Sequence, residues 1–180
     1  MARKLEFPSI IVPKLVTGCK IWHLRDESDF FTKANFEAAM KSIPDGSTLL
    51  MSFGEIDCRE GLLVAVERMR YADLAAGIEF TISIYIAVLK KLAAQRKFTL
   101  LVHPVPPVLN ETRHIVKQFN AALQAALAKL AHARIRYLDF FEQMLSADGE
   151  KLADGLALDG THLHPDYVRL VAKAVEAVGI

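Results

Sequence analysis

A short stretch near the C-terminus, Leu158-Asp159-Gly160-Thr161-His162-Leu163-His164-Pro165, carries the residues best suited to chemistry. Asp159 and His162 stand three positions apart, just before a predicted helix whose first turn suits Pro165, because proline lacks an N–H that would have no partner there. A carboxylate at this spacing can accept the imidazole Nδ1–H and leave Nε2 free as a base. We therefore predict an acid–base pair; the alternative is an ordinary helix start that Asp159 caps.

A second group of charged residues, Glu55, Asp57 and Arg59, directly follows a predicted strand. Gly54 at the start of this loop permits a sharp turn and close approach of the backbone. In a functional interpretation, the loop presents backbone N–H groups and the Arg59 guanidinium to an anion or a developing oxyanion. In a structural interpretation, Arg59 bridges Asp57 or Glu55 and holds the loop, since partly buried carboxylates are usually paired.

Both groups need a sheet to place them, and the pattern of apolar residues predicts one. Predicted helices alternate with predicted strands, which indicates a parallel sheet with helices on both faces in a single domain over residues 1–180. The continuous apolar run of residues 47–53 is typical of a strand buried on both faces. Sites in such sheets form beyond the carboxyl ends of the strands, where both charged groups fall. The predicted strands are 19–24, 47–53, 98–102 and 135–138, and the predicted helices are 30–43, 61–69, 73–96, one beginning at 111–112, 140–145 and one from 165 to 175.

Composition narrows the class of protein. A net charge of +1 argues against a nucleic-acid partner, and a hydrophobic content of 52% is ample for a core in a chain of 180 residues. We find no apolar run of transmembrane length and no secretory signal, so we expect a cytoplasmic protein with no membrane partner. Cys19 and Cys58 are too few for a disulfide framework, in agreement with that expectation.

Three blocks of the sequence resemble the SGNH, or GDSL-type, hydrolases. They are a strand ending in a Gly-x-x-Asp loop, a proline-rich loop after the next strand at residues 103–110, and the C-terminal Asp-x-x-His-Leu-x-Pro. The run Phe53-Gly54-Glu55-Ile56-Asp57-Cys58-Arg59 resembles one branch of this family. The likeness covers the chain from about Gly18 onward, and its C-terminal block is the most specific.

The resemblance implies a three-layer α/β/α, flavodoxin-like fold and hydrolysis of a small-molecule ester or acyl substrate, with no metal or organic cofactor. By this resemblance His162 is the general base, Asp159 is its orienting acid, and Gly18 matches the glycine of the family's second block, which binds the oxyanion. Gly54, Asp57 and Arg59 are then expected to contribute to the substrate or oxyanion site.

Two features depart from the family. No Gly-Asp-Ser block, the family's source of the serine nucleophile, occurs in the sequence, and Ser9, the only serine before Gly18, lies between Pro8 and Ile10. Ile56 stands where the family commonly has an asparagine that donates to the oxyanion. Losing the nucleophile of a triad costs about a millionfold in turnover. We therefore expect either that the first strand and its nucleophile block are missing from this chain, or that the site has another use; the first is favoured because the Asp159–His162 pair is kept.

Other interpretations remain open. Cys19 or Cys58 could replace the serine, although a cysteine in apolar surroundings usually serves only to fill the core. His162 and His164, together with Asp159, could be metal ligands, which the spacing of the two histidines in a loop disfavours. Besides a hydrolase, the chain could be a non-catalytic protein that binds a small anionic or sugar ligand at the same rim. A scaffold that forms a homo-oligomer is the third alternative.

Overall fold

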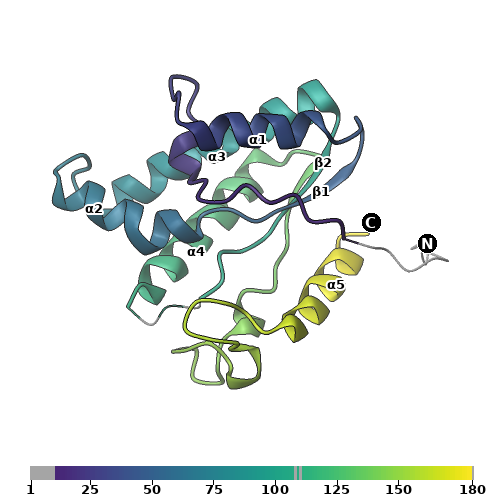
Figure 1. The fold of residues 1–180 in the computed structure, drawn as a ribbon. Coiled ribbons are helices and arrows are strands. Elements are labelled where there is room, and N and C mark those ends of the chain that lie inside the picture. Colours follow the sequence, from purple (N-terminus) through teal and green to yellow (C-terminus); the bar gives the residue numbers. More distant parts are fainter. Residues whose placement is uncertain (1–10, 108, 110, 180) are drawn as a thin grey trace.

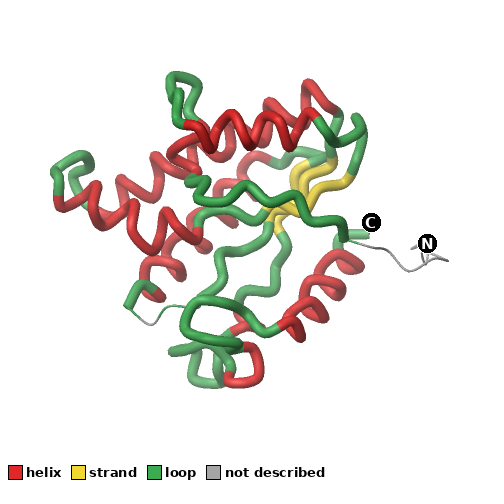
Figure 2. Tube along the Cα trace, in the orientation of Figure 1, coloured by secondary structure: helices red, strands yellow, loops and turns green. Residues whose placement is uncertain are grey.

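The computed structural model describes residues 11–107, 109 and 111–179 and, within them, a sheet of three parallel strands (Figure 1). The strands are β1 (Thr48–Met51), β2 (Thr99–Val102) and β3 (Ile135–Tyr137), in the order β1-β2-β3. Leu100 at the centre pairs with Leu49 of β1 and with Ile135 of β3. The predicted α/β class with a parallel sheet is confirmed, and Figure 2 shows how helices surround the strands.

Helices connect the strands, as the apolar spacing predicted. Asp73 caps the longest predicted helix, because its carboxylate accepts the N–H of Ala76 at 2.8 Å. None of the helices in the described part of the chain is long and apolar enough to cross a bilayer. The α-helices are α1 (Phe31–Lys41), α2 (Leu62–Glu67), α3 (Leu74–Arg96), α4 (Arg113–Leu130) and α5 (Val168–Ala177); short 3₁₀ helices are η1 (Ile21–Leu24), η3 (Glu142–Met144), η4 (Asp154–Leu156) and η5 (Pro165–Tyr167), and η2 (Asp57–Gly61) is a π-helical turn.

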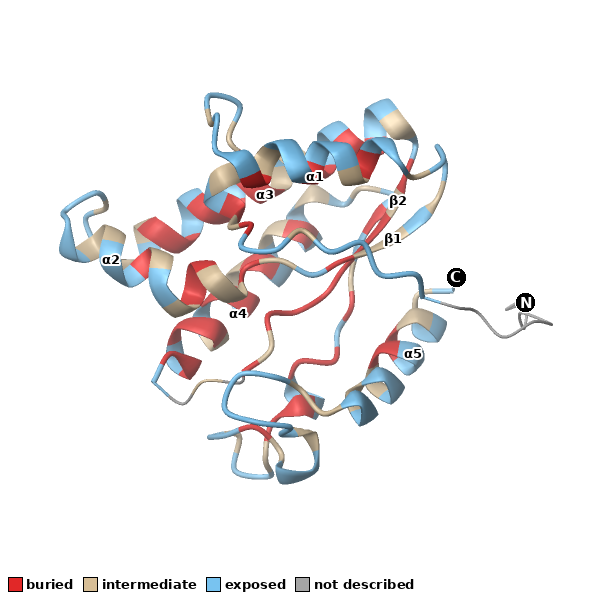
Figure 3. Cartoon of the chain, viewed as in Figure 1, coloured by how far each residue is buried: buried red, intermediate tan, exposed pale blue. Residues whose placement is uncertain are grey.

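Aromatic side chains join α1 and α3 to the sheet. The ring of Phe53, which follows β1, contacts Phe36 of α1 with 5.6 Å between centroids and Tyr85 of α3 with 6.0 Å. The Tyr85 hydroxyl donates to the Met51 carbonyl at 3.3 Å, so this buried phenol is not left without a partner. These contacts fix the end of β1, from which the charged loop begins, and Figure 3 shows the buried residues concentrated around the strands.

The prediction of a strand at residues 19–24 is wrong, because Ile21–Leu24 form the 3₁₀ helix η1. Backbone N–H groups at the start of this helix donate to the side chain of Asp57 rather than to a neighbouring strand. A segment whose donors are satisfied in this way gains nothing from pairing with the sheet.

β1 is an edge strand of the described sheet, whereas its sequence predicted burial on both faces. Thr48 is exposed and Leu50 only partly buried, while the corresponding Leu101 of β2 is 3% exposed. The carbonyls of Ser47 and Met51 accept N–H groups of the chain that includes β2. Alternation along a strand then directs the N–H and C=O of Leu50 away from β2, toward the outer edge.

Candidate functional site

The C-terminal motif forms a closed loop. Ala157 and Leu163 form an antiparallel bridge, and the N–H of Leu158 donates to the His162 carbonyl at 3.1 Å. Inside this loop one carboxylate oxygen of Asp159 accepts the backbone N–H groups of Thr161 at 2.7 Å and of His162 at 2.8 Å. Short-range hydrogen bonds therefore determine how Asp159 and His162 face each other.

The imidazole of His162 contacts the carboxylate of Asp159 through Nδ1, at 2.8 Å from Oδ2 and 3.0 Å from Oδ1. Because a carboxylate only accepts, Nδ1 carries the proton of the neutral ring and Nε2 has a free lone pair. The backbone N–H of Thr161, the imidazole and the N–H of His162, in that order, hold the pKa of Asp159 well below its ordinary value. Asp159 is thus a stable anion that orients His162.

This pair lies at the surface. The side chain of His162 is 71% exposed and that of Asp159 is 52% exposed, so Nε2 is accessible to a small molecule.

His164, two residues later, caps η5 by accepting the N–H of Asp166 at 3.2 Å. Its Nδ1 is therefore used by the backbone. Within the described residues no group of three or more His, Cys, Asp or Glu side chains could hold a metal ion.

Asp57 belongs to the interior beneath the charged loop. It is 3% exposed, and its carboxylate accepts the N–H groups of Ile21 at 2.8 Å and Trp22 at 3.2 Å. Burial raises the pKa of Asp57, while these two backbone donors oppose the rise. The observed contacts of Asp57 therefore hold the 18–22 segment against the loop that begins at Gly54.

The two predicted glycines have different surroundings. Gly54 is buried with φ +106, and a Cβ there would lie 2.8 Å from Val105 Cγ2 and 3.2 Å from Phe119 Cε1. Only glycine fits, so the loop can pass close beneath the chain that follows β2. Gly18 has φ +70 in an exposed turn, where a Cβ would meet no atom within 4 Å. It lies three residues before Ile21, which Asp57 anchors.

Arg59 is already paired with carboxylates. Its Nη1 lies 3.3 Å from Glu55 Oε1 and its Nε lies 3.5 Å from Glu60 Oε1. The structural interpretation is thus confirmed for Glu55, whereas Asp57 bonds to the backbone instead. Arg59 lies in η2, a π-helical turn of a kind frequent at functional sites. One cation between two carboxylates leaves this cluster with a net negative charge.

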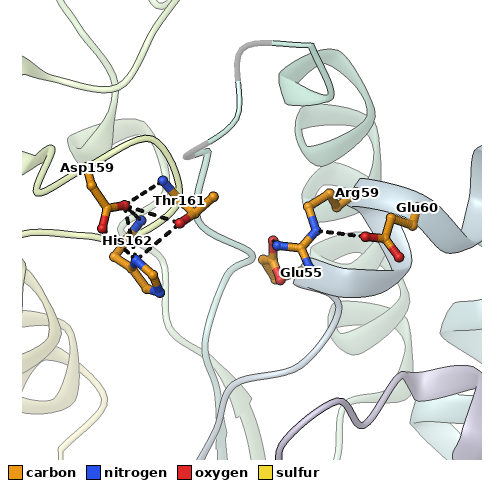
Figure 4. Close-up of polar contacts among 6 residues, drawn as sticks. All are labelled: Glu55, Arg59, Glu60, Asp159, Thr161 and His162. Atoms are coloured by element: carbon orange, nitrogen blue, oxygen red, sulfur yellow. Dashed lines mark hydrogen bonds and ion pairs between the residues drawn. The ribbon is translucent and has the colours of Figure 1, made fainter.

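Figure 4 shows the Asp159–Thr161–His162 group and the Glu55–Arg59–Glu60 group as two separate clusters. No hydrogen bond or ion pair within the described residues joins them. In the sequence, the Glu55–Arg59–Glu60 group comes after β1, which ends at Met51. The Asp159–Thr161–His162 group comes after β3. The structure therefore brings Gly54 and Asp57 together with Arg59 in one loop, and Asp159 together with His162 in another.

The alternative nucleophiles differ in access. Cys19 is 7% exposed and Cys58 is fully buried, and burial raises the pKa of both thiols, which disfavours the reactive thiolate. Ser52 lies within the run 47–53 that was predicted to be a strand buried on both faces, but it follows the end of β1 and is exposed.

One contribution to the site, that of Thr161, was not anticipated from the sequence. The hydroxyl of Thr161 lies 3.2 Å from Asp159 Oδ1 and 3.1 Å from His162 Nδ1; its position between the two could have indicated a third polar contact. His103, at the end of β2, is 3% exposed, and its Nε2 is buried with no hydrogen-bond partner among the residues that the structure describes. Its Nδ1 lies 2.6 Å from the Pro104 carbonyl.

Comparison with known protein-family models and with curated proteins found no match.

Proposed function

We propose that this chain is the acid–base part of an SGNH-type hydrolase that acts on ester or acyl bonds. The observation that carries the proposal is the 2.8 Å contact between Asp159 Oδ2 and His162 Nδ1, with Nε2 exposed. In this role His162 Nε2 removes the proton from a hydroxyl nucleophile and returns it to the leaving group, while Asp159 stabilises the imidazolium.

The sequence lacks the family's serine nucleophile, and we place it at the outer edge of β1, which pairs with no strand within the described residues. β1 has the composition of a central strand and turns the N–H and C=O of Leu50 outward. A further parallel strand at this edge, ending in a serine, would extend the sheet toward the three-layer, flavodoxin-like arrangement. We expect a chain extended by such a strand, with a Gly-Asp-Ser block at its end, to be far more active.

In this proposal, the segment around Gly18 and the loop after Gly54 stabilise the oxyanion. Backbone N–H groups near Gly18 and Gly54 are the proposed donors, since Ile56 has no side-chain donor. Asp57 supports this arrangement indirectly, because it fixes the segment after Gly18 to the loop after Gly54. Arg59, paired with Glu55 and Glu60, would contribute its remaining N–H groups.

Hydrolysis of p-nitrophenyl acetate tests the proposal. We expect His162→Ala to lower the rate above the buffer background by at least about tenfold, and Asp159→Asn to lower it as well because the wrong tautomer is then favoured. His114→Ala is the matched control, since His114 is an exposed histidine on α4. Equal rates for wild type and His162→Ala would refute the proposal that this chain is an enzyme.

A second measurement identifies any nucleophile within this chain. An activated organophosphate that labels reactive serines, followed by mass spectrometry, is expected to leave Cys19 and Cys58 unmodified because both are buried. Labelling of Ser52, lost in Ser52→Ala and in His162→Ala, would show that the exposed serine after β1 serves His162. No labelling of this chain, together with labelling of the extended chain, is the result expected from the missing strand.

The alternative function is binding of a small ligand without turnover at the same rim. The exposure of the Asp159–His162 pair favours it as second candidate, because a hydroxyl-rich ligand can bond to both. Arg59, already neutralised by two carboxylates, argues for a sugar rather than an anion. Calorimetric titration with glucose and with inorganic phosphate discriminates the two ligand classes, and binding without hydrolysis would replace the enzyme proposal.

A further inference from the structure

The Asp159–His162 pair lacks the burial that holds many such pairs together. Both side chains are more than half exposed, so water competes for the hydrogen bond between them. Exposed ion pairs on neighbouring turns contribute little by themselves. A pair in this setting needs additional contacts if the imidazole is to keep one orientation.

The structure supplies these contacts by dividing the carboxylate of Asp159 between two tasks. Oδ2 makes the shorter contact with the imidazole, at 2.8 Å. Oδ1 accepts the N–H groups of Thr161 and His162 and lies 3.2 Å from the Thr161 hydroxyl. Figure 4 shows the three side chains grouped together, with dashed contacts from Thr161 to both Asp159 and His162.

The direction of the threonine hydrogen bond follows from the donors present. Thr161 Oγ1 also lies 3.1 Å from His162 Nδ1, but that nitrogen already carries the proton that points to Asp159. The hydroxyl therefore donates to Asp159 Oδ1 and turns a lone pair toward the Nδ1–H. Both interactions favour the tautomer with the proton on Nδ1.

We propose that Thr161 is a positioning residue: its hydroxyl holds the Asp159 carboxylate and the His162 imidazole in the arrangement that leaves Nε2 free. This inference rests on the proposed function for its catalytic meaning, but the geometry it assigns can be measured without any reaction. Thr161→Val keeps the shape of the side chain and removes the hydroxyl, whereas Thr161→Ser keeps the hydroxyl. Thr48→Val, on the exposed end of β1, is the matched control.

Nitrogen-15 NMR of the imidazole rings reads the tautomer directly, with the His162 signals identified by their loss in His162→Gln. We expect the neutral ring to carry its proton on Nδ1 in wild type, Thr161→Ser and Thr48→Val. In Thr161→Val we expect both tautomers, because one of the contacts that select Nδ1–H is gone. Unfolding curves for the four proteins check that the loop remains folded.

Kinetics give the second readout. The His162-dependent rate with p-nitrophenyl acetate is expected to fall about tenfold in Thr161→Val, the size of one lost hydrogen bond, and about twofold or less in Thr161→Ser. If wild type shows no His162-dependent rate but the tautomers behave as expected, the proposed function fails and the role of Thr161 stands. If hydrolysis depends on His162 while Thr161→Val matches wild type in tautomer and rate, the role of Thr161 is overturned alone.

Discussion

The carboxylate of Asp57 accepts the backbone N–H of Ile21 at 2.8 Å across 36 positions of the sequence. A second oxygen accepts the N–H of Trp22, so one buried side chain satisfies two donors at the start of η1. This contact attaches the N-terminal part of the described chain to the loop after β1. The loop and the segment that contains Gly18 therefore depend on each other.

Asp57→Ala is expected to lower the free energy of unfolding by about 3 kcal/mol, because two buried N–H groups lose a charged acceptor. Hydrogen exchange at the Ile21 and Trp22 amides should accelerate more than exchange elsewhere in the chain. Asp26→Ala is the control, since Asp26 has a 94% exposed side chain 3.5 Å from Lys91, and such surface pairs contribute little. Similar stability of the two variants would contradict the anchoring role.

The Asp57 contact also shows why part of the fold was predictable and part was not. Helical spacing and continuous apolar runs depend on local sequence, and they correctly predicted α1, α3, β2 and β3. Residues 19–24 have the composition of a strand, but a carboxylate far along the chain takes their N–H groups and makes them a 3₁₀ helix. Long-range contacts of this kind leave no periodic pattern in the sequence.

The candidate site divides in the same way. The Asp159–His162 contact is formed within four residues, and the sequence predicted it correctly. Of the two structural alternatives for Arg59, a bridge to Asp57 or to Glu55, the one to Glu55 four residues away is observed. Burial of Asp57 and exposure of Ser52 depend instead on which segments lie beside β1, and residue spacing does not report that.

Gly54→Ala tests how closely the loop passes the chain after β2. A methyl group there would lie 2.8 Å from Val105 Cγ2, and the backbone at residue 54 has φ +106, which strains any residue other than glycine. We therefore expect a loss of about 2 to 4 kcal/mol in the free energy of unfolding. Gly46→Ala separates the two causes, because Gly46 has φ +79 and open space around it, so only backbone strain of about 1 kcal/mol applies. Equal losses, measured by urea unfolding, would show that the contact with Val105 is unimportant.

The negative charge around Arg59 predicts a preference among substrates, given the proposed hydrolase. Glu55→Gln removes one of the carboxylates that surround Arg59. For a reacting ester about 7 Å away in water, removing a unit charge should raise the rate with the anionic mono-p-nitrophenyl succinate about threefold relative to neutral p-nitrophenyl acetate. The gain should shrink in high salt. A ratio independent of both the variant and salt would place the substrate away from this cluster.

His103 gives the protein a dependence of stability on pH. Burial lowers the pKa of its imidazole in the folded chain, with the Pro104 carbonyl opposing the shift, whereas the unfolded chain keeps the ordinary value of 6.5. Below that value the unfolded state binds more protons, so the contribution of neutral His103 is present above about pH 6.5 and is lost as pH falls toward the lowered folded pKa. Rings of Phe140 and Tyr167 pack against the imidazole, and neither offers a negative charge to an imidazolium.

His103→Phe keeps an aromatic ring between Phe140 and Tyr167 and removes the titrating group. We expect wild type to lose stability relative to this variant between pH 7 and pH 5, with a slope of up to about 1.4 kcal/mol per pH unit in urea unfolding. Other histidines, including His23, whose pKa burial also lowers, are present in both proteins and cancel in the difference. Parallel stability curves for the two proteins across this range would mean that His103 accepts a proton in the folded state as easily as in the unfolded one, contrary to its burial.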